Sequence, residues 1–327
     1  MQTAVTIVMY HYVRDFSKTQ FPRINGLETS FFISQLEYIQ KHYTVITAEE
    51  LMDWAAKKIE LPHNPLLLTF DDGFSDHIEN VAPILRKAGI QGSFFPPVKA
   101  VLENQLLDVH KIHFLIAKEP DLNLIIQDIF QALDKSRADY GFLSNDSYYK
   151  KCAVANRMDS TEVCFIKGML QSELPREFRK KLTSQLFSKY VSRDETSFAK
   201  ELYMSINDLH EMVDMGMYVG SHSYSHDRLD LLNENEQIFE IERSLDFLDL
   251  IGANTKSWIM CYPYGHWNNA LLNVLKNRGC SVGITTEVEL VKSGMDPLLF
   301  PRIDTNDLPK SKIEPINKWT LKAQTSG

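Results

Sequence analysis

The chain has 327 residues, of which 44% are hydrophobic and 24% are charged, and its formal net charge is −8. This composition is typical of a globular protein with a sizeable core, and the acidic balance without a dense basic run argues against a nucleic-acid partner. No stretch approaches the ~20 apolar residues of a membrane span. The start, MQTAVTIVMYHYVRDF, does not read as a signal peptide, so a cytoplasmic location is expected as the sequence stands. A periplasmic or extracytoplasmic location is expected instead if a leader has been removed.

Eight strand candidates alternate with helical patterns along the chain. The strands are expected at 4–10, 43–46, 66–70, 92–97, 217–221, 257–262, 280–284 and 298–303. Between them, Thr47 and Glu50 form a capping box, and Gly89, Gly252 and Gly279 end three apolar helical faces. This alternation predicts an α/β fold with a mainly parallel sheet. With about seven or eight strands, we expect the sheet to close into a distorted (β/α) barrel.

Residues 102–203 interrupt this alternation, because they show helical faces and no convincing strand. We therefore expect a helical insertion there, between a first part of the barrel at 1–101 and a second part at 204–305, with a C-terminal tail at 306–327. The amphipathic stripes predict packing on the barrel, and a cap over the site is one hypothesis for this insertion. A separate interaction domain is the alternative.

Two adjacent aspartates, Asp71 and Asp72, end the strand candidate in LLLTFDDG. Adjacent carboxylates repel each other, so both stay ionised only beside a cation or several hydrogen bonds. The alternative is a turn, since aspartate before glycine is a common turn former. A turn needs only one aspartate, however, and the C-terminal ends of parallel strands are where barrel active sites gather. Both residues are therefore candidate site residues.

A histidine pair, His222 and His226, follows another strand candidate in SHSYSH. If the segment turns helical, the spacing of four projects both imidazoles from one face, which suits two ligands of a tetrahedral metal. Taken alone, such a pair is at least as often a surface or core pair. Two histidines and one carboxylate leave zinc an open position for water. With Asp72 as that carboxylate, Asp71 is free to act as a base.

Two further segments follow strands at the same rim. In VMYHYV, His11 is a candidate acid, because amide hydrolysis needs a proton for its amine leaving group. A partly buried histidine bonded to the backbone is the alternative. In MCYPYGHWNN, proline and glycine fix a tight loop of the kind that can aim a backbone amide at an oxyanion. Without the other motifs this loop is merely a turn, and His266 in it is expected to be exposed.

These motifs resemble those of the polysaccharide deacetylases that carry the chitooligosaccharide deacetylase homology domain, grouped as carbohydrate esterase family four. TFDDG, residues 69–73, is similar to the family's first motif. This similarity implies that Asp71 is the general base and Asp72 a metal ligand. SHSYSH, residues 221–226, resembles the second motif, whose two histidines complete the metal site.

Two features usual in this family are missing. Cys261 stands where an arginine normally orients the base, and no histidine follows His266 to act as the acid. Both departures fit a subgroup that resembles the poly-N-acetylglucosamine deacetylases, in which the barrel is circularly permuted and the acid comes from an N-terminal YH motif. The similarity implies that His11 is the acid and that Arg302, in FPRID, replaces the missing arginine. A surface ion pair of Arg302 with Asp304 is the alternative.

The resemblance implies a metal-dependent hydrolase that removes N-acetyl groups from an N-acetylated sugar or glycan. In this interpretation Tyr264 supplies a backbone amide to the oxyanion, and its ring lines the sugar pocket. Zinc is the expected ion, with cobalt, nickel or manganese as alternatives. Two other functions stay open: an O-acetyl esterase or deformylase acting on a lipid- or nucleotide-linked sugar, and an inactive metal-bearing carbohydrate-binding relative. The sequence leaves the particular glycan and the oligomeric state open.

Overall fold

The computed structural model of the protein describes residues 4–156 and 159–325, which form two compact units. The first unit takes the chain up to Asp15, then Gly26–Gln105, then the chain from Lys200 onward. The second unit takes Phe16–Asn25 and Leu106–Ala199. The idea that the helices of this second unit cap a site stays a hypothesis.

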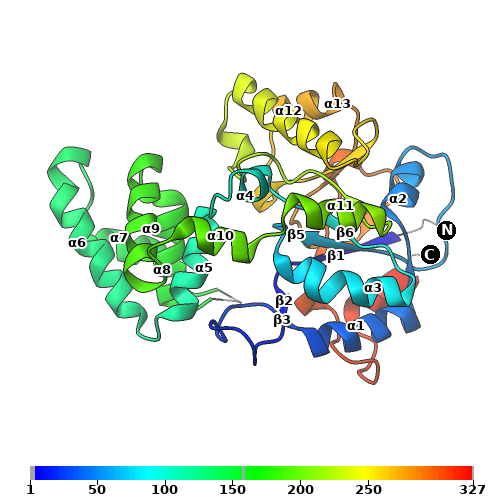
Figure 1. Ribbon diagram of the computed structural model, residues 1–327, viewed down its shortest axis with the longest axis horizontal. Helices are drawn as coiled ribbons and strands as arrows, with labels where there is room; N and C mark the ends of the chain where they lie inside the picture. The colour runs from blue at the N-terminus through cyan, green and yellow to red at the C-terminus, as the bar shows by residue number, and fades with distance from the viewer. Residues whose placement is uncertain (1–3, 157–158, 326–327) are drawn as a thin grey trace. The chain divides into compact units, whose positions relative to one another are not determined.

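The first unit is built on a seven-stranded sheet that is parallel except at one edge (Figure 1). The main path of the sheet runs through β10 (Val291–Lys292), β1 (Ala4–Tyr10), β5 (Pro65–Asp71), β6 (Ser93–Phe95) and β7 (Tyr218–Val219). Two short strands pair beside this path, β4 (Thr44–Val45) with β5 and β11 (Ile303–Asp304) with β1. Only the pair of β1 with β10 is antiparallel in this sheet.

The remaining strands form two separate two-stranded sheets. These pair β8 (Trp258–Cys261) with β9 (Cys280–Ile284) and β2 (Val13–Arg14) with β3 (Leu27–Glu28). Single parallel bridges outside the named strands link Ser221 to Met260 and Ile284 to Phe300. Among the described residues the named strands thus do not pair around a full ring. The α/β class and the mainly parallel pairing are confirmed, whereas closure into a barrel is not.

The local signals in the sequence account for most elements of the first unit. The capping box of Thr47 and Glu50 is present at the start of α2, and α3 ends at Gly89 in the left-handed conformation. The strand expected at 298–303 is mostly wrong, because Pro297 begins a short turn and only Ile303 of that range lies in a strand. The helices are α1 (Thr29–His42), α2 (Ala48–Ala55), α3 (Ala82–Ala88), α4 (Val98–Leu102), α11 (Ile206–Asp214), α12 (Glu234–Leu250), α13 (Asn269–Lys276) and α14 (Lys318–Thr325).

The second unit contains helices joined by turns and loops, and no strand among its described residues. Its apolar stripes meet in one core, which includes Ile125, Ile129, Phe165 and Leu186. The buried ammonium of Lys111 is neutralised within this unit by Glu195, at 2.7 Å. Its helices are α5 (Asp108–Lys118), α6 (Leu122–Tyr140), α7 (Asn145–Cys152), α8 (Thr161–Gly168) and α9 (Arg176–Tyr190), and α10 (Glu195–Leu202) begins in it.

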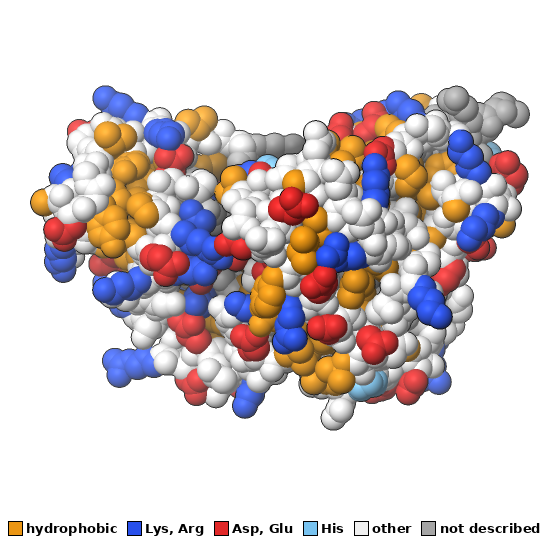
Figure 2. Space-filling view, turned by 90° about the horizontal axis from the view of Figure 1, so that it is seen from above, with side chains coloured by type: hydrophobic (Ala, Val, Ile, Leu, Met, Phe, Trp, Pro, Cys, Tyr) orange, Lys and Arg blue, Asp and Glu red, His pale blue; other side chains and the backbone are white. Residues whose placement is uncertain are grey.

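Acidic and basic side chains are interspersed on the face that Figure 2 shows. No single basic patch dominates this face. Within residues 4–156 and 159–325, no helix combines the length and the apolar character that a membrane crossing requires.

The alternation of side chains along β5 decides which of them reach the site. Leu66, Leu68 and Phe70 belong to one core, whereas Leu67 belongs to another that it shares with residues of β8 and β9. Because side chains in a strand alternate with a period of two, Asp71 projects from the same face of β5 as Leu67. A charged side chain is thus carried to the edge of an apolar core.

One histidine, His77, is fully buried among aromatic side chains beside β5. It belongs to the short π-helical turn η1 (His77–Val81), and its ring lies 5.6–5.7 Å from those of Phe70, Phe74 and Phe94. Burial lowers the pKa of this imidazole to about 4, although its hydrogen bond to the backbone of His11 opposes the effect. Between about pH 4 and 6.5 the unfolded chain therefore binds more protons at this residue than the folded chain does.

Replacement of His77 by phenylalanine should flatten the acid side of the stability curve. Because the unfolded state binds the extra proton, the free energy of unfolding of the wild type falls as the pH falls from 6.5 to 4. In the variant, the free energy of unfolding should fall less steeply with decreasing pH, by up to about 1.4 kcal/mol per pH unit. Urea unfolding across this range measures it, with the exposed His63→Phe as control. Equal slopes for His77→Phe and the wild type would contradict the assignment.

Candidate functional site

The two adjacent aspartates adopt different backbone conformations. Asp71 ends β5, while Asp72 adopts a left-handed conformation with φ 73°, which turns the chain away from the strand. Gly73 continues the turn at φ 65°, and a Cβ there would lie 2.6 Å from the Cβ of Pro96. The N–H of Asp72 donates to the carbonyl of Phe95, which fixes the turn against β6. A regular strand would send the two carboxylates to opposite faces, whereas this turn leaves Oδ2 of each 3.9 Å from Nε2 of His11.

Asp71 is held by a buried bidentate ion pair with Arg302. The guanidinium Nη1 and Nη2 donate to Oδ1 and Oδ2 of Asp71 at 2.9 and 2.5 Å, and Nε donates to the carbonyl of Thr285. Both residues are at most 2% exposed. Burial alone would raise the pKa of Asp71, but the charge of Arg302, followed by that of His222, outweighs it and lowers this pKa to about 2. Asp71 is therefore ionised at neutral pH.

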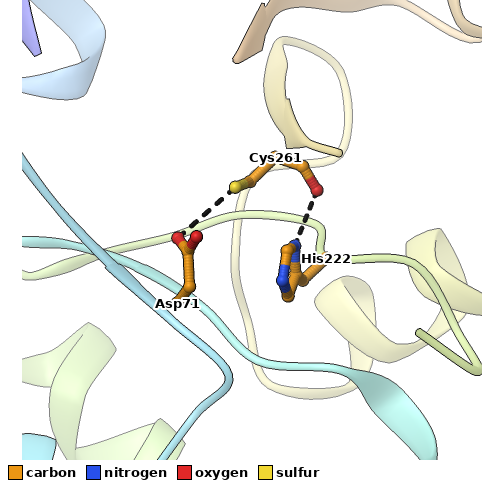
Figure 3. Close-up of side chains that lie close together, drawn as sticks. All are labelled: Asp71, His222 and Cys261. Atoms are coloured by element: carbon orange, nitrogen blue, oxygen red, sulfur yellow. Dashed lines mark hydrogen bonds between the residues drawn. The ribbon is translucent and has the colours of Figure 1, made fainter. Parts of the chain in front are cut away.

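The structure decides between the two interpretations of Arg302 that the sequence left open. Its side chain lies on Asp71 rather than on the surface with Asp304, which instead accepts N–H groups of its own turn. Cys261, which occupies the usual arginine position, also reaches Asp71, with Sγ 3.3 Å from Oδ1 (Figure 3). Burial raises the pKa of this thiol, so that it donates a weak hydrogen bond to the carboxylate.

Loss of Arg302 should be costly for folding. Arg302→Gln leaves the carboxylate of Asp71 buried without its cation, and breaking such a pair costs about 3–5 kcal/mol. Urea unfolding measures this loss. Arg278→Gln, which breaks an ion pair with Glu242 nearer the surface, is the matched control and should cost at most about 1 kcal/mol. If both variants lose the same small amount, the Arg302 pair does not carry this stabilisation.

Asp72 faces the two histidines of the second motif. Its Oδ1 lies 3.5 Å from Nε2 of His222 and 3.3 Å from Nε2 of His226. Residues 222–226 are not helical, so the condition under which the spacing of four would place both imidazoles on one helix face is not met. Left-handed residues at Ser223 (φ 62°) and His226 (φ 58°) instead fold the segment back, and the two imidazole rings come within 4.8 Å. Hydrogen bonds of this loop to neighbouring elements replace those that a helix would make.

The donor atoms of Asp72, His222 and His226 suit a divalent cation. All three lie within 4.8 Å of one another and are buried. Nδ1 of His222 is 2.7 Å from the carbonyl of Cys261 (Figure 3), so this nitrogen carries the proton. Nε2 is then left to face Asp72 at 3.5 Å. A carboxylate and two imidazoles are ordinary zinc ligands. The residues therefore fit the metal that the resemblance implies.

A second group of possible ligands overlaps the first. Asp71, His222 and Cys261 also present donor atoms within 4.8 Å of one another. Both carboxylate oxygens of Asp71 are already engaged by Arg302, however, and Cys261 is a thiol rather than a thiolate. A metal ligand must be deprotonated, and the guanidinium on Asp71 would repel a second cation, so the group with Asp72 is the better site.

The loop that carries the histidines is clamped from two sides. The N–H groups of Val98 and Lys99, at the start of α4, donate to the carbonyls of Ser223 and Tyr224. On the other side, the buried Glu240 of α12 accepts the N–H of Tyr224 at 3.1 Å and the N–H of Ser225 at 2.9 Å. Its second oxygen accepts the hydroxyl of Ser225 at 2.6 Å. These bonds hold a loop whose two left-handed residues are otherwise unfavourable.

Removal of the Glu240 carboxylate should weaken metal binding. Glu240→Ala frees the loop between His222 and His226, and loss of such a supporting contact typically costs about 10- to 100-fold in metal affinity. Competition of zinc with a chromophoric chelator gives the dissociation constant. Glu242→Ala, on the exposed side of the same helix, should leave this constant unchanged. Equal affinity of the Glu240 variant and the wild type would show that the loop does not need the clamp.

The two other candidate residues lie at the same site. Nε2 of His11 is 3.9 Å from Oδ2 of both Asp71 and Asp72, and its side chain is 39% exposed. The ring of Tyr264 lies 4.9 Å from that of His226, and its backbone is left-handed at φ 58°. Strained backbone of this kind concentrates at functional sites. His266 is exposed, as expected.

Two residues of the site escaped sequence reasoning. Glu240 looks like one of several acidic residues on an amphipathic helix, and His77 looks like a helix-surface histidine after the aspartate motif. The spacing along the helix could have predicted that Glu240 is buried, because it lies beside the apolar Ile241 and one turn before Ser244, which is also buried. No pattern in the sequence marks the hydrogen bond of His77 to His11.

Comparison with known proteins supports the resemblance drawn from the motifs. Residues 182–283 match the family model described as polysaccharide deacetylase. Among solved structures, IcaB from Ammonifex degensii aligns with a TM-score of 0.57 at 17% identity, covering 98% of this chain and 100% of that chain. The Streptococcus pyogenes deacetylase PplD in complex with acetate gives 0.55 at 16% identity, covering 96% and 100%. A search of curated proteins gives no match.

A third solved structure, a de-N-acetylase from Aggregatibacter actinomycetemcomitans, gives a TM-score of 0.53 at 17% identity, covering 92% of this chain and 95% of that chain. At such low identity these alignments establish the fold alone. The resemblance is confirmed by sequence over residues 182–283 and by fold over most of the chain. Residues 182–283 are thus similar to the polysaccharide deacetylase family, and most of the chain has the α/β fold of these solved structures.

Proposed function

We propose that this protein is a metal-dependent hydrolase that removes an acetyl group from the nitrogen of an N-acetylated saccharide. A divalent cation held by Asp72, His222 and His226, with zinc as the first choice, would polarise the acetyl carbonyl and favour ionisation of the attacking water. The family match and the deacetylase fold supply the reaction class. The chain's own residues supply the proton transfers.

Each residue has a separate task in this proposal. Asp71 accepts a proton from the water that adds to the acetyl carbon, and Arg302 keeps Asp71 ionised for that step. The backbone N–H of Tyr264 donates to the developing oxyanion. His11 then donates a proton to the nitrogen as the carbon–nitrogen bond breaks, which releases acetate and a free amine. The ring of Tyr264 lines the sugar pocket.

The observation that most supports the proposal is the unequal treatment of the two aspartates. Asp71 is paired with a guanidinium at 2.5 Å, while Asp72 faces two imidazoles at 3.3 and 3.5 Å. A base and a metal ligand need these two different environments. The same pair weighs against an inactive carbohydrate-binding relative, because that alternative was motivated by the missing arginine, and Arg302 supplies a guanidinium.

The Asp71→Asn and Asp72→Asn variants should fail in different ways. Asp71→Asn removes the base and should lower acetate release from N-acetylated oligosaccharides by about 100-fold or more, while zinc stays bound. Asp72→Asn should lose zinc affinity as well as activity. Acetate release and bound zinc are measured on the same preparations. Undiminished turnover of Asp71→Asn would contradict its role as the base.

An ester substrate separates amide hydrolysis from the O-acetyl esterase alternative. An aryl acetate has a leaving group that needs no protonation, so His11→Ala should retain most ester hydrolysis while losing amide hydrolysis. An esterase that does not act on amides would release no acetate from N-acetylated saccharides in the wild type.

A further inference from the structure

The segment that follows the two aspartates reaches back to the backbone that carries His11. Asp76 accepts from Nε of Arg14 at 2.8 Å, and Nδ2 of Asn80 donates to the carbonyl of Val13 at 2.9 Å. Between these two bonds, Nε2 of His77 is 2.9 Å from the carbonyl oxygen of His11. Three side-chain contacts thus tie residues 76–80 to residues 11–14, although more than 60 residues separate the two segments.

The imidazole of His77 is poorly explained as a packing residue. It is fully buried among aromatic rings, and its Nδ1 has no hydrogen-bond partner among the described residues. A buried polar atom without a partner costs about 1–3 kcal/mol, and a phenyl ring would avoid that cost. The bond to His11 is the contribution that a histidine makes here and a phenylalanine does not.

The direction of that bond is fixed by chemistry. A carbonyl oxygen only accepts, so Nε2 of His77 must carry the proton and donate it. The π-helical turn η1 begins at this residue, and such turns are frequent at functional sites. Since His77 follows Asp71 by six residues in the same segment, it connects the backbone of the candidate base to that of the candidate acid.

The ring of His11 needs such support. Its Nε2 lies 3.9 Å from the nearest oxygens of Asp71 and Asp72, which is too long for a hydrogen bond. The position of this ring therefore depends on the backbone at the end of β1. A shift of about 1 Å in a reacting group can cost about 100-fold in rate.

We propose that His77 is a positioning residue, which fixes the candidate acid His11 relative to the base Asp71 by donating a hydrogen bond to the carbonyl of His11. This inference rests on the proposed deacetylase function. The proposed effect on catalysis passes through the hydrogen bond of His77 to the carbonyl of His11.

A double-mutant cycle tests this proposal. The zinc-loaded wild type, His77→Phe, His11→Ala and the double variant are compared for acetate release from an N-acetylated oligosaccharide. His77→Phe should lower kcat about 10- to 100-fold with KM and bound zinc unchanged, because only proton transfer is misplaced. In the His11→Ala background the same change should alter kcat less than about twofold, since the group it positions is gone.

A second variant separates the hydrogen bond from the shape of the ring. His77→Gln keeps an N–H donor at a similar reach and should recover most of the kcat that His77→Phe loses. An equal loss from His77→Phe in both backgrounds, or an unchanged kcat, would overturn the positioning role. The wild type is assayed first. If it releases no acetate, that result contradicts the proposed function rather than the positioning role.

Discussion

The buried pair of Arg302 with Asp71 is the interaction on which the rest of the site depends. Two carboxylates at the end of one strand would repel each other, and burial would favour the neutral acid at one of them. The guanidinium satisfies both oxygens of Asp71, so this residue stays ionised without a metal. The left-handed turn at Asp72 then gives the second carboxylate to His222 and His226. Two adjacent acids therefore meet two different environments, a guanidinium and a pair of imidazoles.

The supporting contacts follow from the strained backbone of the site. Asp72, Ser223, His226 and Tyr264 all adopt positive φ angles, which a non-glycine residue adopts only when its surroundings hold it there. Glu240 and the start of α4 hold the histidine loop, and the backbone of Phe95 holds the aspartate turn. Parts of the first unit that are far apart in the chain thus supply the restraints that bring the ligands together.

Local patterns in the sequence predicted many of the secondary-structure elements. The strand candidates at 4–10 and 280–284 coincide with β1 and β9. A short apolar run between turn residues can be recognised from the local sequence alone. The expected closure into a barrel is not confirmed, and local patterns do not reveal that single bridges such as Ser221 to Met260 stand between the separate sheets. The spacing of the two histidines would suit a helix, but left-handed residues at 223 and 226 bring the imidazoles together in a loop instead. Arg302 and Asp71 are 231 residues apart, so only a resemblance could suggest their contact.

The central claim is that the metal belongs to Asp72 and the two histidines while Asp71 stays free as a base. A crystal structure with zinc, located by anomalous scattering at the zinc edge, tests it directly. We expect one ion about 2.0–2.2 Å from an oxygen of Asp72 and from Nε2 of His222 and His226, with Asp71 still paired to Arg302. An ion bound instead by Asp71, His222 and Cys261, or no ion near Asp72, would contradict the account.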